Sequence, residues 1–385
     1  MLHVFPSFEV GGSQQRTTRL IDRLGPQFQH LVMSLSGRDE ARSRLTHPER
    51  ITWLAAPPQG GTLSTARRLR AVLAEQKPDV LCTYNWGSID ALLGRAWLGP
   101  SARPGALHHE DGFGADEVQK PKLRRSLARR LALRGAHGVV VPSTRLHGLA
   151  RGPWGVPEER LHLIPNGVDA EHFSPGAGGE PLRAELGVPP DARVVGCVGG
   201  LRPEKNLGRA LEALALLPGD VHLILVGDGP ERAELERRAA AAPLAGRVHF
   251  AGAHRDTGPW FRAFDVFLLP SDTEQMPIAL VEAMASECAA VSTMVGDVAT
   301  ILPPQQHPYV VPLGALRGAP SGDAGNVARA LRELLDDPRR AAELGTANRA
   351  RALAEFSEAR MVQRFDALYR SAAKSRDGAR TVQAP

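Results

Sequence analysis

The feature that most constrains the fold is an alternation of short apolar runs and longer helical patterns along most of the 385 residues. Short apolar runs rich in β-branched residues are typical of buried strands, and alternation with helices predicts βαβ units, parallel sheets and an α/β fold. The predicted strands are 2–6, 30–35, 51–55, 80–84, 106–109, 139–142, 161–164, 194–198, 221–226, 248–251, 266–269 and 289–292. The predicted helices include 14–24, 63–75, 120–133, 206–216, 231–241, 278–285 and 326–335.

The length suits two domains better than one, because a single core rarely grows this large. Between Asp169 and Ala192, Gly, Pro and acidic residues interrupt the periodic pattern, which predicts a domain boundary there. We therefore expect an N-terminal domain over residues 1–172 and a C-terminal domain over 173–356. The polar residues 374–385 predict a disordered tail.

The composition is that of a soluble globular protein, with 43% hydrophobic and 23% charged residues. A net charge of +5 favours anionic partners such as phosphates or anionic lipid, or reflects an arginine-rich surface. The N-terminus lacks a signal-peptide pattern and no apolar run is long enough to span a bilayer, which predicts a cytoplasmic protein. Cys82, Cys197 and Cys288 lack metal-site spacing, so we expect buried thiols and no metal site.

The segment SDTEQMPIALVEAMA, from Ser271 to Ala285, carries two glutamates, Glu274 and Glu282, eight positions apart. Pro277 suits the first turn of a helix, which places Glu274 in the loop after strand 266–269 and Glu282 on the helix. Ligands of open α/β sheets bind at the carboxyl ends of the strands. Because carboxylates accept hydrogen bonds from hydroxyl groups, this pair indicates a ligand such as ribose or hexose.

A second segment, CVGGLRPEKN, joins a buried strand to a helix through two glycines, Arg202 and Lys205. Glycines allow a ligand to approach the backbone, and a helix N-terminus together with two cations favours a diphosphate. The alternative is that these are surface charges beside a turn. The segment VGDGP after strand 221–226 lacks the third glycine of a dinucleotide fingerprint, which disfavours a nicotinamide enzyme.

The pattern E-x-M-P-x-A-L-x-E-A-M-A, which holds Glu274 and Glu282, resembles the signature of retaining glycosyltransferases of family 4. The resemblance implies a GT-B architecture: two Rossmann-like domains face each other across a cleft, and a C-terminal helix, here about 357–373, crosses back to the N-terminal domain. It implies transfer of a hexose from a UDP- or GDP-linked sugar to a glycan or lipid-linked acceptor, in polysaccharide or glycoconjugate biosynthesis. The nucleotide sugar would be a co-substrate, with no cofactor. The Arg202 and Lys205 pair and the absence of a DxD motif indicate independence of metal.

The resemblance also assigns roles to individual residues. Lys205 and Arg202 would stabilise the leaving diphosphate, Glu274 would hold sugar hydroxyls, and Glu282 would bind the ribose. Gly200 stands where the family has arginine, so Arg202 either replaces that arginine or the phosphate site is weaker. The other donor-binding residues implied are Gly11, Gly12, Gly200, Pro277 and Ile278.

Two departures from the family pattern accompany these matches. Ser13 and Gln14 follow the glycine pair where many members carry Ala and Glu. The run Glu287-Cys288-Ala289 replaces a Gly-x-Pro turn, which predicts a turn of different shape.

The segment HHEDGFGADE follows strand 106–109, where members of the family often carry a histidine that contacts the donor sugar. His108, His109 and Asp111 all remain candidates for that contact. His108 and Asp111 are also candidates for a contact with the acceptor, and His109 is a candidate catalytic residue. The alternative is that the histidines are structural. A related turn, IPNGVD from Ile164, resembles the family segment that closes the N-terminal half, and we interpret it as architectural.

Residues 120–134 combine many basic side chains with a leucine stripe. The stripe is formed by Leu123, Leu127, Leu131 and Leu133, and the basic residues are Lys120, Lys122, Arg124, Arg125, Arg129, Arg130 and Arg134. One interpretation is a basic amphipathic helix that contacts an anionic membrane, at its inner face. The other is a domain helix with leucines in the core and arginines in water. No interleaved aromatics support nucleic-acid binding.

Two other functions remain open on the sequence. A GT-B-fold sugar-nucleotide epimerase would bind the same donor, and product analysis without an acceptor would distinguish it. A non-catalytic sugar-nucleotide-binding partner in polysaccharide assembly is the third hypothesis, and Gly200 in place of the family arginine supports it.

Overall fold

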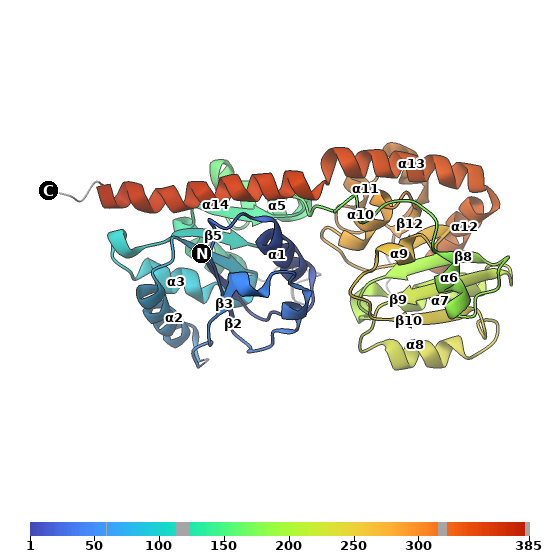
Figure 1. The fold of residues 1–385 in the computed structure, drawn as a ribbon, viewed down its shortest axis with the longest axis horizontal. Helices are drawn as coiled ribbons and strands as arrows, with labels where there is room; N and C mark the ends of the chain where they lie inside the picture. The colour runs from blue at the N-terminus through green and yellow to red at the C-terminus, as the bar shows by residue number, and fades with distance from the viewer. Residues whose placement is uncertain (59, 113–122, 315–321, 382–385) are drawn as a thin grey trace. The chain divides into compact units, whose positions relative to one another are not determined.

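The computed structural model describes residues 1–58, 60–112, 123–314 and 322–381. The chain forms two compact units (Figure 1). The N-terminal unit comprises Met1–Asn166 together with Ala359–Pro385, and the C-terminal unit comprises Gly167–Glu358. Each unit is a parallel sheet covered by helices, as the alternation of apolar runs predicts.

The sheet of the N-terminal unit has the strand order β3-β2-β1-β4-β5-β6-β7, and all its pairings are parallel. The strands are β1 (Leu2–Phe5), β2 (His30–Ser34), β3 (Ile51–Trp53), β4 (Val80–Tyr84), β5 (Gly105–His109), β6 (Gly138–Val141) and β7 (Leu161–Leu163). The helices are α1 (Gly12–Arg23), α2 (Thr62–Gln76), α3 (Asp90–Ala96), α4 (Leu123–Ala132), α5 (Thr144–Arg151) and α14 (Glu358–Thr381).

The sheet of the C-terminal unit has the order β10-β9-β8-β11-β12-β13 and is also parallel. The strands are β8 (Arg193–Val198), β9 (Val221–Val226), β10 (Val248–Gly252), β11 (Val266–Leu269), β12 (Ala289–Thr293) and β13 (Val310–Val311). The helices are α6 (Glu180–Glu185), α7 (Leu207–Ala215), α8 (Arg232–Ala239), α9 (Gly258–Phe261), α10 (Ile278–Ala285), α11 (Val298–Ile301), α12 (Gly322–Asp336) and α13 (Pro338–Glu355).

Both faces of each sheet are buried, which explains why the strands are continuous apolar runs. In β11, Val266 and Leu268 join one hydrophobic cluster while Phe267 and Leu269 join the cluster on the opposite face. This is the two-residue period of a strand. The three cysteines are buried, and burial raises the pKa of the Cys82 and Cys288 thiols to about 12.

The last helix completes the core of the N-terminal unit. Phe365, Tyr369 and Ala372 of α14 are buried in one cluster with Phe5 of β1 and Tyr84 of β4. In Figure 1 this helix, drawn in red, runs along the N-terminal unit. Two α/β units, each with a parallel sheet, and the return of the chain to its first unit are therefore present as the resemblance implies.

The structure differs from the expected elements in three places. The segment 169–192 belongs to the C-terminal unit, because Phe173 is buried against Phe261 in that unit's core. Residues 374–381 continue helix α14, so the expected disorder there is wrong for that stretch. Strand β13 and helix α13 were not expected, because a two-residue strand and a helix rich in Ala and Arg show weak periodicity.

Candidate active site

Four loops meet at the carboxyl edge of the C-terminal sheet, after β8, β9, β11 and β12. The first two are joined by backbone hydrogen bonds, 2.9 Å from Gly199 N to Val226 O and 3.0 Å from Leu201 N to Asp228 O. Gly227 has φ +145°, and a Cβ there would lie 1.9 Å from the carbonyl oxygen of Gly199. A Cβ on Gly229 would likewise lie 2.4 Å from Leu201 O, so the two glycines of VGDGP are required by the contact between the loops.

The loop after β12 fixes the backbone around Glu274. Gly296 has φ +51°, and a Cβ there would lie 2.4 Å from the carbonyl oxygen of Glu274. Asp297 N donates to Gln275 O at 3.1 Å, and Thr293 Oγ1 donates to Ser271 O at 2.6 Å. The carboxylate of Glu274 consequently projects from a loop that is held on two sides.

Lys205 and Glu274 form the central contact of the site. Lys205 Nζ lies 2.6 Å from Glu274 Oε1, and Ser271 Oγ donates to the same oxygen at 2.8 Å. The side chains are 28% and 11% exposed, so a ligand in solvent can reach both. The structure thus brings together the residue predicted to bind phosphate and the residue predicted to bind sugar hydroxyls.

Asp272 joins the Lys205 loop to the Glu274 loop, and sequence reasoning missed it. Its Oδ1 accepts hydrogen bonds from Arg209 Nη2 at 2.8 Å and from Asn206 Nδ2 at 3.0 Å, and its N–H donates to Glu204 O at 2.9 Å. Asn206 adopts the left-handed conformation, with φ +43°, and accepts from Arg209 N as the cap of α7. Spacing along the chain carries no signal for these contacts, because they arise only when the loops after two strands meet.

Arg202 lies beside Gly200. Its backbone N–H donates to Gly200 O at 2.9 Å, and a Cβ on Gly200 would lie 3.3 Å from Arg202 Nε. The exposed arginine side chain thus passes next to the position where the family carries its arginine. Its role toward phosphate stays a prediction.

The predicted positions of Glu274 and Glu282 on a loop and on the following helix are confirmed. Pro277 immediately precedes α10, with φ −68°, and Ile278 is the first residue of the helix. Glu282 is 4% exposed. Ribose binding by Glu282, and donor contacts of Pro277 and Ile278, stay predictions.

The glycine pair of the N-terminal unit lies between β1 and α1. Gly11 has an extended backbone and precedes α1, and Gly12 is the first helical residue. Gln14 folds back over the loop: its Nε2 donates to Ser7 O at 2.8 Å, and its Oε1 would lie 2.8 Å from a Cβ on Gly11. The contact of Gly11 and Gly12 with donor phosphates stays a prediction.

The three candidates near residue 109 differ sharply in exposure. His108 and His109 are both fully buried. The His109 ring stacks on Tyr84 at 4.5 Å, and burial, followed by the charge of Arg16, holds its pKa well below the usual value. The Asp111 side chain is 13% exposed. The sugar contact therefore stays a prediction for all three, with Asp111 the one that solvent reaches.

Helix α4 reverses the usual placement of leucine and arginine. Leu123, Leu127 and Leu131 are 86%, 58% and 55% exposed. Arg129 is fully buried, with Nε 3.0 Å from Glu110 Oε2 and the guanidinium near the Trp86 and Trp154 rings. The expectation of buried leucines holds only for Leu133. Lys120 and Lys122 lie outside the described residues.

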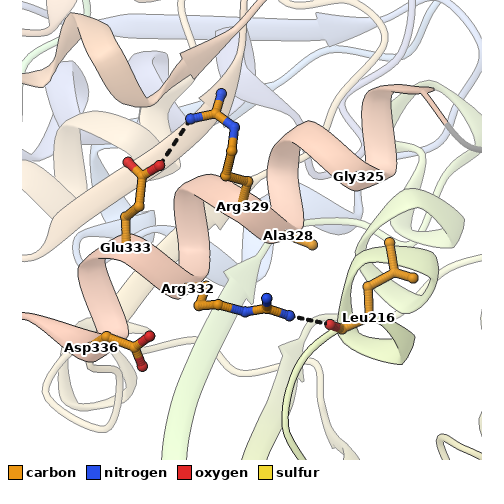
Figure 2. A pocket seen from close by; sticks show the side chains of 7 residues that line it. All are labelled: Leu216, Gly325, Ala328, Arg329, Arg332, Glu333 and Asp336. Atoms are coloured by element: carbon orange, nitrogen blue, oxygen red, sulfur yellow. Dashed lines mark hydrogen bonds and ion pairs between the residues drawn. The ribbon is translucent and has the colours of Figure 1, made fainter.

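A surface pocket on the C-terminal unit lies away from these loops. Figure 2 shows it between α12 and Leu216, with Arg332 Nη2 donating to Leu216 O at 2.6 Å. At its far end Asp336 pairs with Arg193, the first residue of β8, so the pocket extends to the amino edge of the sheet. None of the predicted site residues lines it.

Two kinds of feature are absent from the described part of the chain. No helix there is long and apolar enough to cross a membrane. No three His, Cys, Asp or Glu side chains there gather as a metal site would require.

Known proteins match both units. Residues 192–337 match the family described as "Glycosyl transferases group 1", and residues 10–172 match "Glycosyltransferase Family 4". EpsF of Bacillus subtilis, which is named as a glycosyltransferase, is 29% identical over 74% of this chain and 77% of its own length. The 2-deoxystreptamine glucosyltransferase of Streptomyces kanamyceticus is 30% identical over 58% of this chain and 57% of that enzyme.

Solved structures share the fold at lower identity. Anabaena Alr3699/HepE in complex with UDP has a TM-score of 0.77 at 21% identity, covering 96% of this chain and 99% of that one. Sucrose-phosphate synthase from Thermosynechococcus elongatus has a TM-score of 0.79 at 22% identity, covering 96% and 98%. The fold and these matches together define a GT-B glycosyltransferase. More particularly, the chain belongs to the group 1 glycosyltransferase family, which confirms the resemblance.

Proposed function

We propose that this protein is a retaining hexosyltransferase that uses a UDP- or GDP-linked sugar, needs no metal ion, and glycosylates a glycan or lipid-linked acceptor. The observation that carries the proposal is the contact between Lys205 and Glu274 at the carboxyl edge of the C-terminal sheet. Solved structures of Alr3699/HepE, which shares the fold, hold UDP-glucose or UDP with glucose, which supports a nucleotide sugar as the donor.

The ion pair gives the two residues linked roles. A diphosphate that approaches Lys205 carries more negative charge than one carboxylate, so it competes with Glu274 for the ammonium group. Glu274 is then released to accept hydrogen bonds from sugar hydroxyls, while Ser271 still contacts it. Donor binding would therefore replace one ion pair by two interactions with the ligand.

In the transfer step, the bond between the anomeric carbon and the β-phosphate oxygen breaks, and the oxygen keeps the electron pair. The acceptor oxygen bonds to the anomeric carbon on the same face, and its proton passes to the departing phosphate oxygen. Lys205, together with Arg202, stabilises the charge that grows on the phosphate. No covalent bond to the protein is needed in this route.

The test is a nucleotide-release assay with UDP- and GDP-sugars, methyl glycosides and short-chain lipid-linked sugars as acceptors, with and without EDTA. We expect release that depends on acceptor and survives EDTA, and NMR of the product should show the donor's anomeric configuration. An altered sugar formed without acceptor would instead indicate an epimerase. Stabilisation by nucleotide sugars without turnover would favour a non-catalytic binding partner.

We also propose that the protein is cytoplasmic and that α4 contacts anionic lipid at the inner face of the membrane. The exposed leucines Leu123, Leu127 and Leu131 share the helix surface with the exposed Arg130, and Arg134 follows one turn later. An apolar stripe flanked by arginines suits the boundary between acyl chains and anionic headgroups.

Vesicle flotation tests this contact. We expect the protein to float with phosphatidylglycerol vesicles and less with neutral ones. Leu127→Glu should abolish flotation, whereas Leu63→Glu, which changes a leucine that is 69% exposed on α2, should not. Equal flotation of the two variants would argue against α4 as the contact surface.

A further inference from the structure

A polar cluster lies at the carboxyl edge of the N-terminal sheet. Asn85 follows β4, Asp111 follows β5, and Asn166 follows β7. Arg16 of α1 joins them: its Nη1 and Nη2 donate to the two carboxylate oxygens of Asp111, the second at 2.9 Å, and Nη1 also lies 3.3 Å from Asn166 Oδ1. This edge is where open α/β sheets bind ligands.

Arg16 is held in this cluster at an energetic cost. The residue is 2% exposed, and its guanidinium carbon lies 5.5 Å from the centre of the Phe365 ring of α14. Its Nε–H is buried without a hydrogen-bond partner in the described part of the chain. A buried guanidinium with an unsatisfied donor is unfavourable unless its remaining donors are used well. Here those donors fix Asp111.

Asn85 adds backbone strain at the same point. It has φ +55° and ψ 179°, a region that glycine alone visits readily and that strains the backbone of other residues. Its Oδ1 accepts from Asp111 N at 2.8 Å, and its own N–H donates to His109 O at 2.7 Å. A glycine would relieve the strain but could not make the side-chain bond to Asp111.

We propose that Asp111 binds hydroxyl groups of the acceptor, and that Arg16 and Asn85 are positioning residues that hold its carboxylate in place. A carboxylate offers about four acceptor sites, and the guanidinium occupies only two. The Asp111 side chain remains 13% exposed, so hydroxyl donors can reach it. Because Arg16 already balances the charge, the site suits neutral hydroxyl groups rather than cations. The inference rests on the proposed glycosyltransferase function and names its acceptor residue.

The test measures KM separately for donor and acceptor, using the methyl glycoside that gives turnover. For Asp111→Asn we expect the acceptor KM to rise about tenfold, the size of one lost charge-assisted hydrogen bond, with the donor KM unchanged. Arg16→Lys should move the acceptor KM in the same direction. Asp39→Asn, which changes a half-exposed carboxylate on the same unit, should leave both constants unchanged.

Asn85→Gly separates positioning from stability. The glycine relieves the unfavourable φ, so we expect the melting temperature to stay or rise while the acceptor KM increases. A purely structural role would not split the two readouts in this way. An unchanged acceptor KM in both Asp111→Asn and Asn85→Gly would overturn the inference. Failure of the unaltered protein to glycosylate any acceptor would count against the proposed function instead.

Discussion

Lys205 Nζ and Glu274 Oε1 are 2.6 Å apart, so the two residues with the strongest functional signatures in the sequence neutralise each other in the C-terminal unit. They come from loops after β8 and β11, 69 positions apart in the chain. The contact forms because β8 and β11 are neighbours in the sheet and end at the same edge.

Lys205→Ala should reduce kcat about 10²-fold or more, because it removes a cation that stabilises the leaving phosphate. Steady-state kinetics of nucleotide release would measure the effect. Arg237→Ala is the matched control, since it removes an exposed cation of the same unit that pairs with Glu234. Near-normal turnover of Lys205→Ala would contradict the assigned role.

Arg202→Ala should cost a similar factor of about 10² in kcat if its side chain replaces the family arginine at position 200. The structure allows a direct rescue, because the side chain that a Cβ on Gly200 would contact is Arg202 itself. We expect Gly200→Arg in the Arg202→Ala background to restore much of the lost rate. A double variant no faster than Arg202→Ala would contradict the idea that Arg202 replaces the family arginine of position 200.

The structure shows how Glu287 is accommodated where the family carries glycine. It adopts φ +66°, the left-handed conformation that favours glycine, in the turn where the family carries Gly-x-Pro. Its Oε1 accepts a hydrogen bond from Thr346 Oγ1 of α13 at 2.7 Å. The side-chain bond offsets part of the backbone strain.

We therefore expect Glu287→Gly to be more stable than Glu287→Ala by about 1 kcal/mol, since both lose the bond to Thr346 and only glycine loses the strain. Denaturant unfolding of the two variants would measure the difference. Equal stability would mean that position 287 carries no left-handed strain.

Buried histidines should make the protein sensitive to acid. Burial, followed by the charge of Arg16, lowers the pKa of His109 in the folded state, whereas the unfolded value is about 6.5. Burial, followed by the N-terminal ammonium, lowers the pKa of His30 to about 3. Between pH 6.5 and pH 3 the unfolded chain binds more protons than the folded chain does. The contribution of these histidines to the free energy of unfolding is therefore fully present above pH 6.5 and falls as the pH drops toward 3.

His109→Phe should remove the part of this loss that is due to His109, which is up to about 1.4 kcal/mol of unfolding free energy per pH unit. Neither ring nitrogen has a hydrogen-bond partner in the described residues, and a phenyl ring can stack on Tyr84 and Phe365. Urea unfolding at pH 7.5, 6.5 and 5.5 measures how the free energy of unfolding depends on pH in the two proteins. Turnover of His109→Phe decides the separate prediction that this residue contacts the donor sugar.

The strands, their parallel pairing and the positions of the site loops could be predicted because burial on both faces leaves a strong apolar signal. The expected domain boundary after residue 172 lies close to the division between Asn166 and Gly167, but the attachment of the polar segment to the C-terminal unit through the buried Phe173 left no signal in the sequence. The sequence also left two interpretations of α4 open, and the pairing of Arg129 with Glu110 decides which face of that helix is buried. Contacts of this kind join residues distant in sequence and leave no periodic trace.

The placement of α14 has a consequence for the order of folding. Residues 359–385 supply part of the N-terminal unit, although the whole C-terminal unit is synthesised between. Until Phe365 and Tyr369 leave the ribosome, the aromatic side chains of β1 and β4 lack the helix that covers them. The N-terminal unit is thus synthesised before the C-terminal unit but can complete its core only after it. Until then its sheet is partly uncovered and accessible to chaperones.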